Sequence, residues 1–119
     1  MLNLDTHILI FALQGTLRRR EKELLSTHRW GISAIVLWEL AKLVQLRRVT
    51  LNLDAIEVAD VLSALHVWPI DLPISRASTH LDFCGDPANE LIAATSLVHQ
   101  VPLLTRDKQI LRSRLVPFP

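Results

Sequence analysis

Hydrophobic residues along the chain form short continuous runs, separated by longer segments in which apolar residues recur at helical spacing. The short runs lack the alternation of a half-exposed strand, and continuity of this kind is typical of strands covered on both faces. We therefore expect β-strands at residues 2–5, 30–33, 66–70, 101–105 and 115–118.

The segments between these runs predict helices at residues 6–13, 17–27, 34–46, 54–65, 75–83 and 87–99, with a helical turn at 108–112. Ser33, Asp54, Ser75 and Asp86 are expected to begin helices, and Pro87 suits a first helical position. Strands that alternate with helices predict a central parallel sheet in a three-layer α/β/α sandwich. With no linker or repeat, residues 1–119 are expected to form one domain. In such folds, sites form beyond the carboxyl ends of the strands.

Composition is consistent with one folded domain. The chain has 119 residues, of which 50% are hydrophobic and only 3 are glycine, so a sizeable core can form. The 13 basic and 12 acidic residues give a formal net charge of +1, so only local patches can attract nucleic acid. The single cysteine, Cys84, excludes an internal disulfide and fits a reducing compartment. We expect Cys84 to be a small buried hydrophobe.

No targeting or membrane segment is expected from the sequence. The first residues lack a basic lead, and Asp5 interrupts their apolar run, which is unlike a signal peptide. No apolar run approaches the roughly 18 residues that a membrane span requires. The sequence therefore predicts a soluble, cytoplasmic protein without membrane association.

Four acidic residues occupy positions that suit a shared site. Asp5 and Asp107 follow predicted strands, Asp86 precedes a helix, and Glu39 lies inside an apolar helix. A buried lone carboxylate is costly, and two carboxylates about 4 Å apart repel by roughly 4 kcal/mol at an effective dielectric of about 20. A cluster of them requires a cation, and oxygen ligands suit Mg²⁺ or Mn²⁺. The histidine spacing and the single cysteine indicate against zinc.

Each acid also has a purely structural explanation. Asp5, Asp86 and Asp107 each precede a predicted helix, so each side chain could simply cap it. Glu39 could lie at the surface if its helix is slightly rotated. The joint placement of all four at one predicted edge of the sheet favours a common site over four unrelated roles.

Four motifs spread along the whole chain resemble a known family. They are residues 4–7 (LDTH), 33–43 (SAIVLWELAKL), 86–96 (DPANELIAATS) and 102–107 (PLLTRD). In this order they resemble the PIN domain family, and within it the VapC-type toxins of bacterial toxin–antitoxin pairs. The last two motifs, at this separation, are the most specific.

The resemblance implies cleavage of RNA phosphodiester bonds by a metal-activated water, with Mg²⁺ or Mn²⁺ as cofactor and no side-chain nucleophile. It implies that Asp5 and the turn at residues 86–89 hold the metal ion, and that Glu39 and Asp107 complete the acidic pocket, partly through water. The implied catalytic residues are therefore Asp5, Glu39, Asp86 and Asp107, and the implied metal ligands are Asp5, Asp86, Asn89 and Asp107.

Supporting residues and partners follow from the same resemblance. Thr6 and Thr105 are expected to hydrogen-bond the carboxylates, and Arg106 and Arg112 to contact RNA. The family implies a cognate antitoxin protein and a homodimer, for which an exposed apolar stripe on the early helices would be suitable.

Position 89 departs from the family pattern, which reads D-P-A-D-E where this chain has Asn89. Asparagine keeps the size and one carbonyl oxygen but loses the negative charge. The change predicts weak Mg²⁺ binding and slow or absent cleavage, unless Asp86 takes the metal instead.

Two other functions compete with the nuclease. One is a catalytically inactive PIN module that still binds antitoxin or RNA. The other is a phospho-receiver domain, which would require paired acids after the first strand and a lysine after the last. The chain has only Asp5 at the first of these positions, and it ends in Val-Pro-Phe-Pro.

Arginine clusters at residues 18–20 and 47–48 are further candidates for phosphate contact. Glu21 and Glu23 interleave with the first cluster, which favours a solvated helix face over a binding surface. The tryptophans are expected in the core or in an interface and not as platforms for stacked bases; they are Trp30, Trp38 and Trp68.

Overall fold

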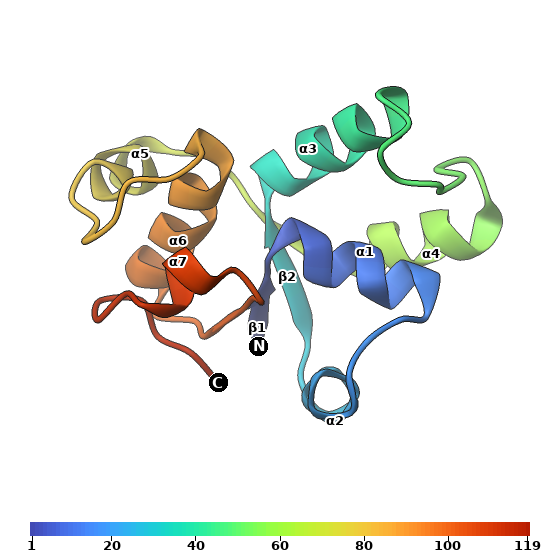
Figure 1. Ribbon diagram of the computed structural model, residues 1–119, viewed down its shortest axis with the longest axis horizontal. Helices are drawn as coiled ribbons and strands as arrows, with labels where there is room; N and C mark the ends of the chain where they lie inside the picture. The colour runs from blue at the N-terminus through green and yellow to red at the C-terminus, as the bar shows by residue number, and fades with distance from the viewer.

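Four short parallel strands form the centre of the protein, which is described here by a computed structural model of residues 1–119 (Figure 1). They are β1 (Leu2–Leu4), β2 (Trp30–Ser33), β3 (His66–Trp68) and β4 (Leu103–Leu104), in the order β3-β2-β1-β4. β1 lies between β2 and β4, with Asn3 opposite both Gly31 and Leu103. The predicted parallel sheet is confirmed, although β4 is shorter than the run at residues 101–105.

Seven helices surround the sheet. Figure 1 shows α5, α6 and α7 on one side of the strands and α1, α3 and α4 on the other, which confirms the three-layer arrangement. None of the helices is both long and apolar enough to cross a lipid bilayer. Their bounds are α1 (Thr6–Gln14), α2 (Arg19–Thr27), α3 (Ala34–Gln45), α4 (Ile56–Ala64), α5 (Leu72–Ser78), α6 (Pro87–His99) and α7 (Lys108–Leu111).

The central strand is buried on both faces, as its apolar run predicts. Leu2, Asn3 and Leu4 are all 0% exposed. The Asn3 side chain donates hydrogen bonds to the Ile92 carbonyl (3.0 Å) and to Ser96 Oγ (2.9 Å), which tie β1 to α6. The polar residue of the strand therefore fixes the helix that carries one edge of the candidate site.

Two predicted helix starts are wrong. α4 begins after Ala55 and not at Asp54. α5 begins at Leu72, because the Asp71 side chain accepts a hydrogen bond from the Ile74 backbone N–H (3.0 Å) and proline follows in the first turn. Ser75, predicted to open this helix, lies inside it, and its hydroxyl donates to the Asp71 carbonyl.

The predicted last strand at residues 115–118 does not form. Its only hydrogen bond toward the sheet runs from the Leu103 N–H to the Pro117 carbonyl (2.9 Å), and proline has no N–H with which to extend a ladder. Cys84 is exposed, contrary to prediction, because α5 ends at Ser78 and leaves residue 84 in a surface loop.

The tryptophans divide between core and surface. Trp68 is buried, and Trp30 is half-buried and donates its indole N–H to the Leu25 carbonyl (2.8 Å). Trp38 is 58% exposed on α3, so it does not belong to the core, and its predicted role in an interface stays a prediction.

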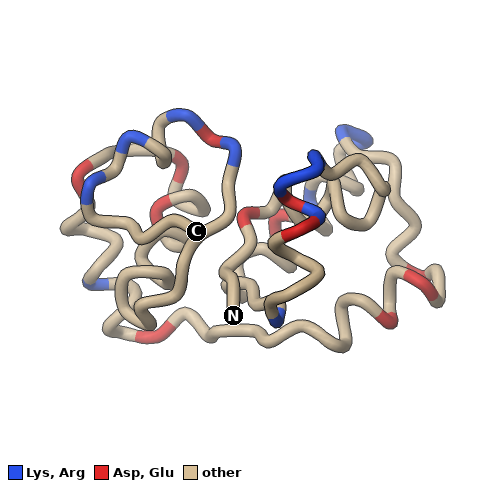
Figure 2. The backbone as a smooth tube through the Cα atoms, turned by 90° about the horizontal axis from the view of Figure 1, so that it is seen from below, with Lys and Arg blue, Asp and Glu red and all other residues tan.

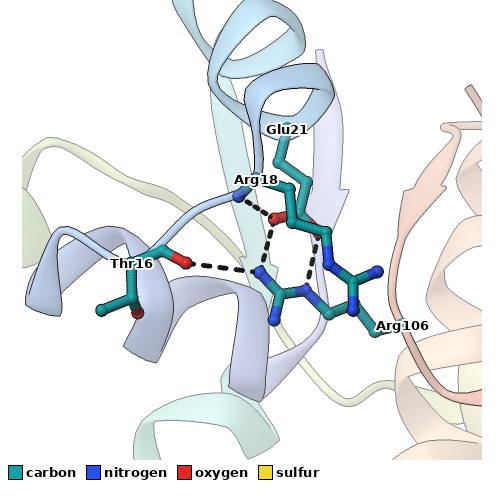
Figure 3. A network of polar contacts seen from close by, with 4 residues as sticks. All are labelled: Thr16, Arg18, Glu21 and Arg106. Carbon is teal, nitrogen blue, oxygen red and sulfur yellow. Dashed lines mark hydrogen bonds and ion pairs between the residues drawn. The ribbon is translucent and has the colours of Figure 1, made fainter.

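An ion pair ties α2 to the segment after β4 (Figure 3). Arg106 donates from Nε to Glu21 Oε2 (2.8 Å) and from Nη2 to Glu21 Oε1 (2.7 Å), and its guanidinium lies 3.9 Å from the centre of the Phe11 ring. Glu21 Oε1 also accepts the Arg18 backbone N–H (2.7 Å). The exposed helix predicted at residues 17–27 forms as α2 and is mostly exposed, but Glu21 and Leu25 are buried.

We expect Gly31→Ala to destabilise the fold by about 1–3 kcal/mol, as overpacking of a core does. A Cβ at position 31 would lie 2.5 Å from Cη2 of the buried Trp68 ring, which has little freedom to move. Denaturant unfolding measures the loss. Gly85→Ala is the matched control, since its Cβ would meet the end of the Gln109 side chain at 3.2 Å and the Phe83 ring no closer than 3.6 Å. Equal stability of the two variants would contradict this packing.

Glu21→Gln is expected to lower the free energy of unfolding at pH 7 by about 1–3 kcal/mol, the range for hydrogen bonds to charged groups. The bonds from Arg106 hold the pKa of Glu21 below its usual 4.5. The stabilisation is therefore fully present above pH 4.5 and is lost as the pH falls through the lowered pKa. Urea unfolding between pH 7 and pH 3 tests this. The control, Glu23→Gln, breaks an exposed pair with Arg19 and should cost only about 0.3–0.5 kcal/mol.

Candidate active site

The four acidic residues singled out in the sequence line one pocket of about 320 Å³. They come from four separate segments: the end of β1, the middle of α3, the start of α6 and the turn after β4. Parallel strands end at the same edge of the sheet, which brings Asp5 and Asp107 together. The complete lining is Asp5, His7, Phe11, Glu39, Asp86, Asn89, Arg106 and Asp107.

Asp5 is the most buried acid of the pocket, at 5% exposed. Its Oδ1 accepts the Thr6 backbone N–H (2.8 Å), and its Oδ2 accepts the Thr105 hydroxyl (2.6 Å). Burial raises the pKa of Asp5 above its ordinary value, and these two hydrogen bonds offset only part of that increase. Asp5 thus caps α1 and lines the pocket as well, so the two explanations offered for it are not exclusive.

Glu39 is half-buried and lines the pocket, so it is not a fully exposed residue on the outer face of its helix. Its Oε1 accepts a short hydrogen bond from the Thr6 hydroxyl. Thr6 therefore contacts both acids, Asp5 through its backbone and Glu39 through its side chain. Glu39 Oε2 has no hydrogen-bond partner within the protein.

Asp107 is held by α7 and by Thr105. Its Oδ1 accepts the backbone N–H groups of Gln109 (2.9 Å) and Ile110 (3.0 Å), and its own N–H donates to Thr105 Oγ1 (3.0 Å). The capping role proposed for Asp107 is present, and Oδ2 remains without a protein partner. The Thr105 hydroxyl joins two acids, because it donates to the Asp5 carboxylate and accepts the Asp107 backbone N–H. With the bond from Thr6 to Glu39, each predicted threonine therefore donates to a carboxylate of the pocket.

The start of α6 contributes Asp86 and Asn89. Asp86 stands at the N-cap position, but its side chain makes no capping hydrogen bond, so the prediction that it caps the helix is wrong. The Asp86 carboxylate is exposed and lines the pocket instead. Asn89, one turn later, is half-buried and lines the same pocket.

The two arginines predicted to contact RNA differ in their surroundings. Arg106 lines the pocket, but its guanidinium already forms an ion pair with Glu21. Arg112 is exposed at the end of α7 and lies outside the pocket lining. His7 and Phe11 line the pocket without having been predicted, although His7 belongs to the LDTH motif and Phe11 follows it one helical turn later.

The donors of the pocket suit a hard divalent cation. Apart from the imidazole of His7, they are carboxylate oxygens and one amide oxygen, and no three His, Cys, Asp or Glu side chains lie close enough to share one ion. Mg²⁺ commonly binds proteins through one or two carboxylates and keeps several waters, which this arrangement permits. A structural zinc site, with four protein ligands, does not fit.

Comparison with known proteins places the chain in a family. The family model described as PIN domain matches residues 3–114. Ribonuclease VapC22 of Mycobacterium tuberculosis is 36% identical over 93 residues, which are 75% of this chain and 70% of that protein. This match agrees with the resemblance seen in the motifs and not with a phospho-receiver domain.

Solved structures share the fold at lower sequence identity. One is a crystal structure of VapBC2 from Rickettsia felis bound to a DNA fragment from the VapBC2 promoter. Its TM-score is 0.74 at 19% identity, and the match covers 100% of this chain and 98% of that one. FitAcB from Neisseria gonorrhoeae has a TM-score of 0.70 at 23% identity, with coverages of 100% and 97%. A toxin–antitoxin complex from Klebsiella pneumoniae has a TM-score of 0.68 at 21% identity, with coverages of 94% and 91%. The chain therefore belongs to the PIN domain family and, within it, to the VapC type.

Proposed function

We propose that this chain is a divalent-metal-dependent endoribonuclease, the toxin of a toxin–antitoxin pair. The observation that carries the proposal is the single pocket lined by carboxylates from four separate segments. The relative named as a ribonuclease supports RNA as the substrate. The donor chemistry of the pocket supports Mg²⁺ or Mn²⁺ as the cofactor.

Asp5 would be the principal metal ligand, and Asp86, Asn89 and Asp107 would complete the sphere at least partly through water, since no three acidic side chains lie close enough to share one ion. A bound Mg²⁺ would lower the pKa of a coordinated water and neutralise charge on the phosphate. Burial already disfavours the charged form of Asp5, so its carboxylate is most stable with a cation beside it.

Glu39 would accept a proton from the attacking water at Oε2, the oxygen without a protein partner. The Thr6 hydroxyl holds the other oxygen and so orients the carboxylate. Thr105 would keep Asp5 and Asp107 in register through its two hydrogen bonds. No side chain of the pocket needs to act as a nucleophile.

Asn89 favours a second candidate, a PIN module that has lost catalysis but still binds its antitoxin or RNA. An amide in place of the family's aspartate removes one negative charge from the metal site. Asp86 has a carboxylate free of capping bonds and could compensate. The proposed nuclease is therefore attenuated and not abolished: Asn89 removes one charge from the metal site, and Asp86 supplies another carboxylate beside it.

The proposed partners are a cognate antitoxin and a second copy of the chain, in the cytoplasm. The solved complexes of similar fold support an antitoxin. Leu37 and Trp38 on α3, 39% and 58% exposed, are candidate contacts for either partner. Arg112 is free to contact RNA, whereas Arg106, already paired with Glu21, would position the loop beside Asp107.

Asp5→Asn is expected to reduce Mg²⁺-dependent RNA cleavage by at least about 100-fold, because loss of a residue that only supports a metal ligand already costs about 10–100-fold. The amide keeps the size of the side chain but loses the charge that binds the ion. Cleavage of a labelled RNA with added Mg²⁺ measures the effect, and circular dichroism checks the fold. Asp60→Asn, an exposed change on α4, is the matched control. Undiminished cleavage by Asp5→Asn would refute the assignment.

Asn89→Asp is expected to tighten Mn²⁺ binding and to speed cleavage, each by about tenfold or more, because it restores a charged ligand. Isothermal titration and the cleavage assay measure the two effects. Asn52→Asp adds the same charge in a loop outside the pocket and serves as control. Equal activity at position 89 with either residue would show that this position is unimportant. Absence of cleavage in both forms, with antitoxin binding intact, would favour the inactive module.

A further inference from the structure

A second polar pocket, of about 380 Å³, shares Arg106 with the acidic pocket. Four basic side chains and one acidic side chain line it, between the start of α2 and the start of α7. In Figure 2, most Lys and Arg positions lie on the side of the molecule drawn at the top, so the basic residues are not spread evenly. The charged lining consists of Arg18, Arg20, Glu21, Arg106 and Lys108.

Two of the four basic side chains in this pocket have no acidic partner. Both oxygens of Glu21 accept hydrogen bonds from Arg106, so these two charges neutralise each other (Figure 3). Arg18 and Lys108 form no ion pair, whereas the Arg20 guanidinium donates to a backbone oxygen of Pro119 (2.6 Å). The positive charges of Arg18 and Lys108 therefore remain without an acidic partner, in one pocket of a chain whose formal net charge is +1.

The structure separates the arginine cluster at residues 18–20 into two kinds of residue. Arg19 is 94% exposed and pairs with Glu23 at 3.3 Å, as a solvated helix face predicts. Arg18 and Arg20 line the pocket instead. The interleaved acids thus do not neutralise the whole cluster, because Glu23 pairs with Arg19 and Glu21 turns inward to Arg106.

The basic pocket is fixed relative to the acidic one. Thr105 lines the basic pocket, and its hydroxyl donates to Asp5 in the acidic pocket. Arg106, Asp107 and Lys108 are consecutive, and Asp107 caps the helix that Lys108 begins. Short covalent and hydrogen-bonded links therefore connect the two pockets, and Arg106 lines both of them.

From this charge pattern we infer that the basic pocket binds a backbone phosphate of the RNA strand whose neighbouring phosphodiester lies in the acidic pocket. This inference rests on the proposed function. Arginine presents several N–H donors in a fork that fits phosphate oxygens, and Lys108 adds a point charge. A polyanion with a phosphate at every nucleotide suits an acidic, metal-binding pocket beside a basic one, because successive phosphates can occupy the two sites.

The test compares two double variants that each remove two positive charges. Arg18→Gln with Lys108→Gln changes the pocket, and Lys22→Gln with Arg76→Gln changes exposed residues outside it. Fluorescence anisotropy of a short labelled oligouridylate, in EDTA to prevent cleavage, gives the affinity over a range of salt concentrations. Because the pocket is proposed to hold one phosphate, losing that contact should reduce the slope of log affinity against log salt by about 0.7, the value per phosphate contact on single strands.

The control double variant should keep the wild-type slope, and Arg18→Lys, which retains the charge, should keep it as well. Denaturant unfolding shows whether each variant folds, and the single variants Arg18→Gln and Lys108→Gln replace the double one if it does not. Equal slopes for the pocket variant and the control would overturn the inference. It would also be overturned if poly-glutamate displaced the RNA from wild type as strongly as an unlabelled oligouridylate of equal length.

Cleavage is measured separately, with Mg²⁺ and the Asn89→Asp chain. RNA binding with the expected loss of slope but without any cleavage would refute the proposed nuclease and leave the phosphate site standing. Cleavage together with an unchanged slope would refute only the phosphate site.

Discussion

The Asp5 carboxylate, almost completely buried at the end of the central strand, is the group around which the site is organised. A buried carboxylate is costly unless hydrogen bonds and a nearby cation stabilise its charge. The backbone N–H of Thr6 and the hydroxyl of Thr105 supply the hydrogen bonds, from the two chain segments that follow β1 and β4. The hydrogen bonds that stabilise Asp5 thus hold together the segments that follow two neighbouring strands. The divalent cation proposed for catalysis would complete this stabilisation.

Two threonines extend this arrangement to the other acids. Thr6 also donates to Glu39, which fixes α3 against the start of α1, and Thr105 also accepts from the N–H of Asp107. Both threonines are buried, so water does not compete strongly for their hydroxyls. Opposite this network, the ion pair of Glu21 and Arg106 anchors α2 to the same turn after β4. That turn consequently carries part of the acidic pocket and part of the basic one.

The two pockets divide the charge of a nearly neutral chain. Carboxylates gather where strands and helices of the parallel sheet end, and unpaired basic residues gather beside them on α2 and α7. Arg106 lines both pockets, but Glu21 balances its charge, so Arg106 adds no net charge to either pocket. Such an arrangement suits an anionic chain that binds beside a metal ion.

The sequence alone determined the layered α/β architecture and the positions of the four acids, because continuous apolar runs and the polar residues that end them are local features. Motif order also indicated the family. The tertiary structure decided which side chains meet: Glu21 is buried because Arg106 reaches it from far along the chain, and Asp86 lines the pocket without capping α6. It also decided that Arg18 and Arg20, but not Arg19, line the basic pocket. These outcomes depend on contacts between distant segments, and local sequence patterns do not specify such contacts.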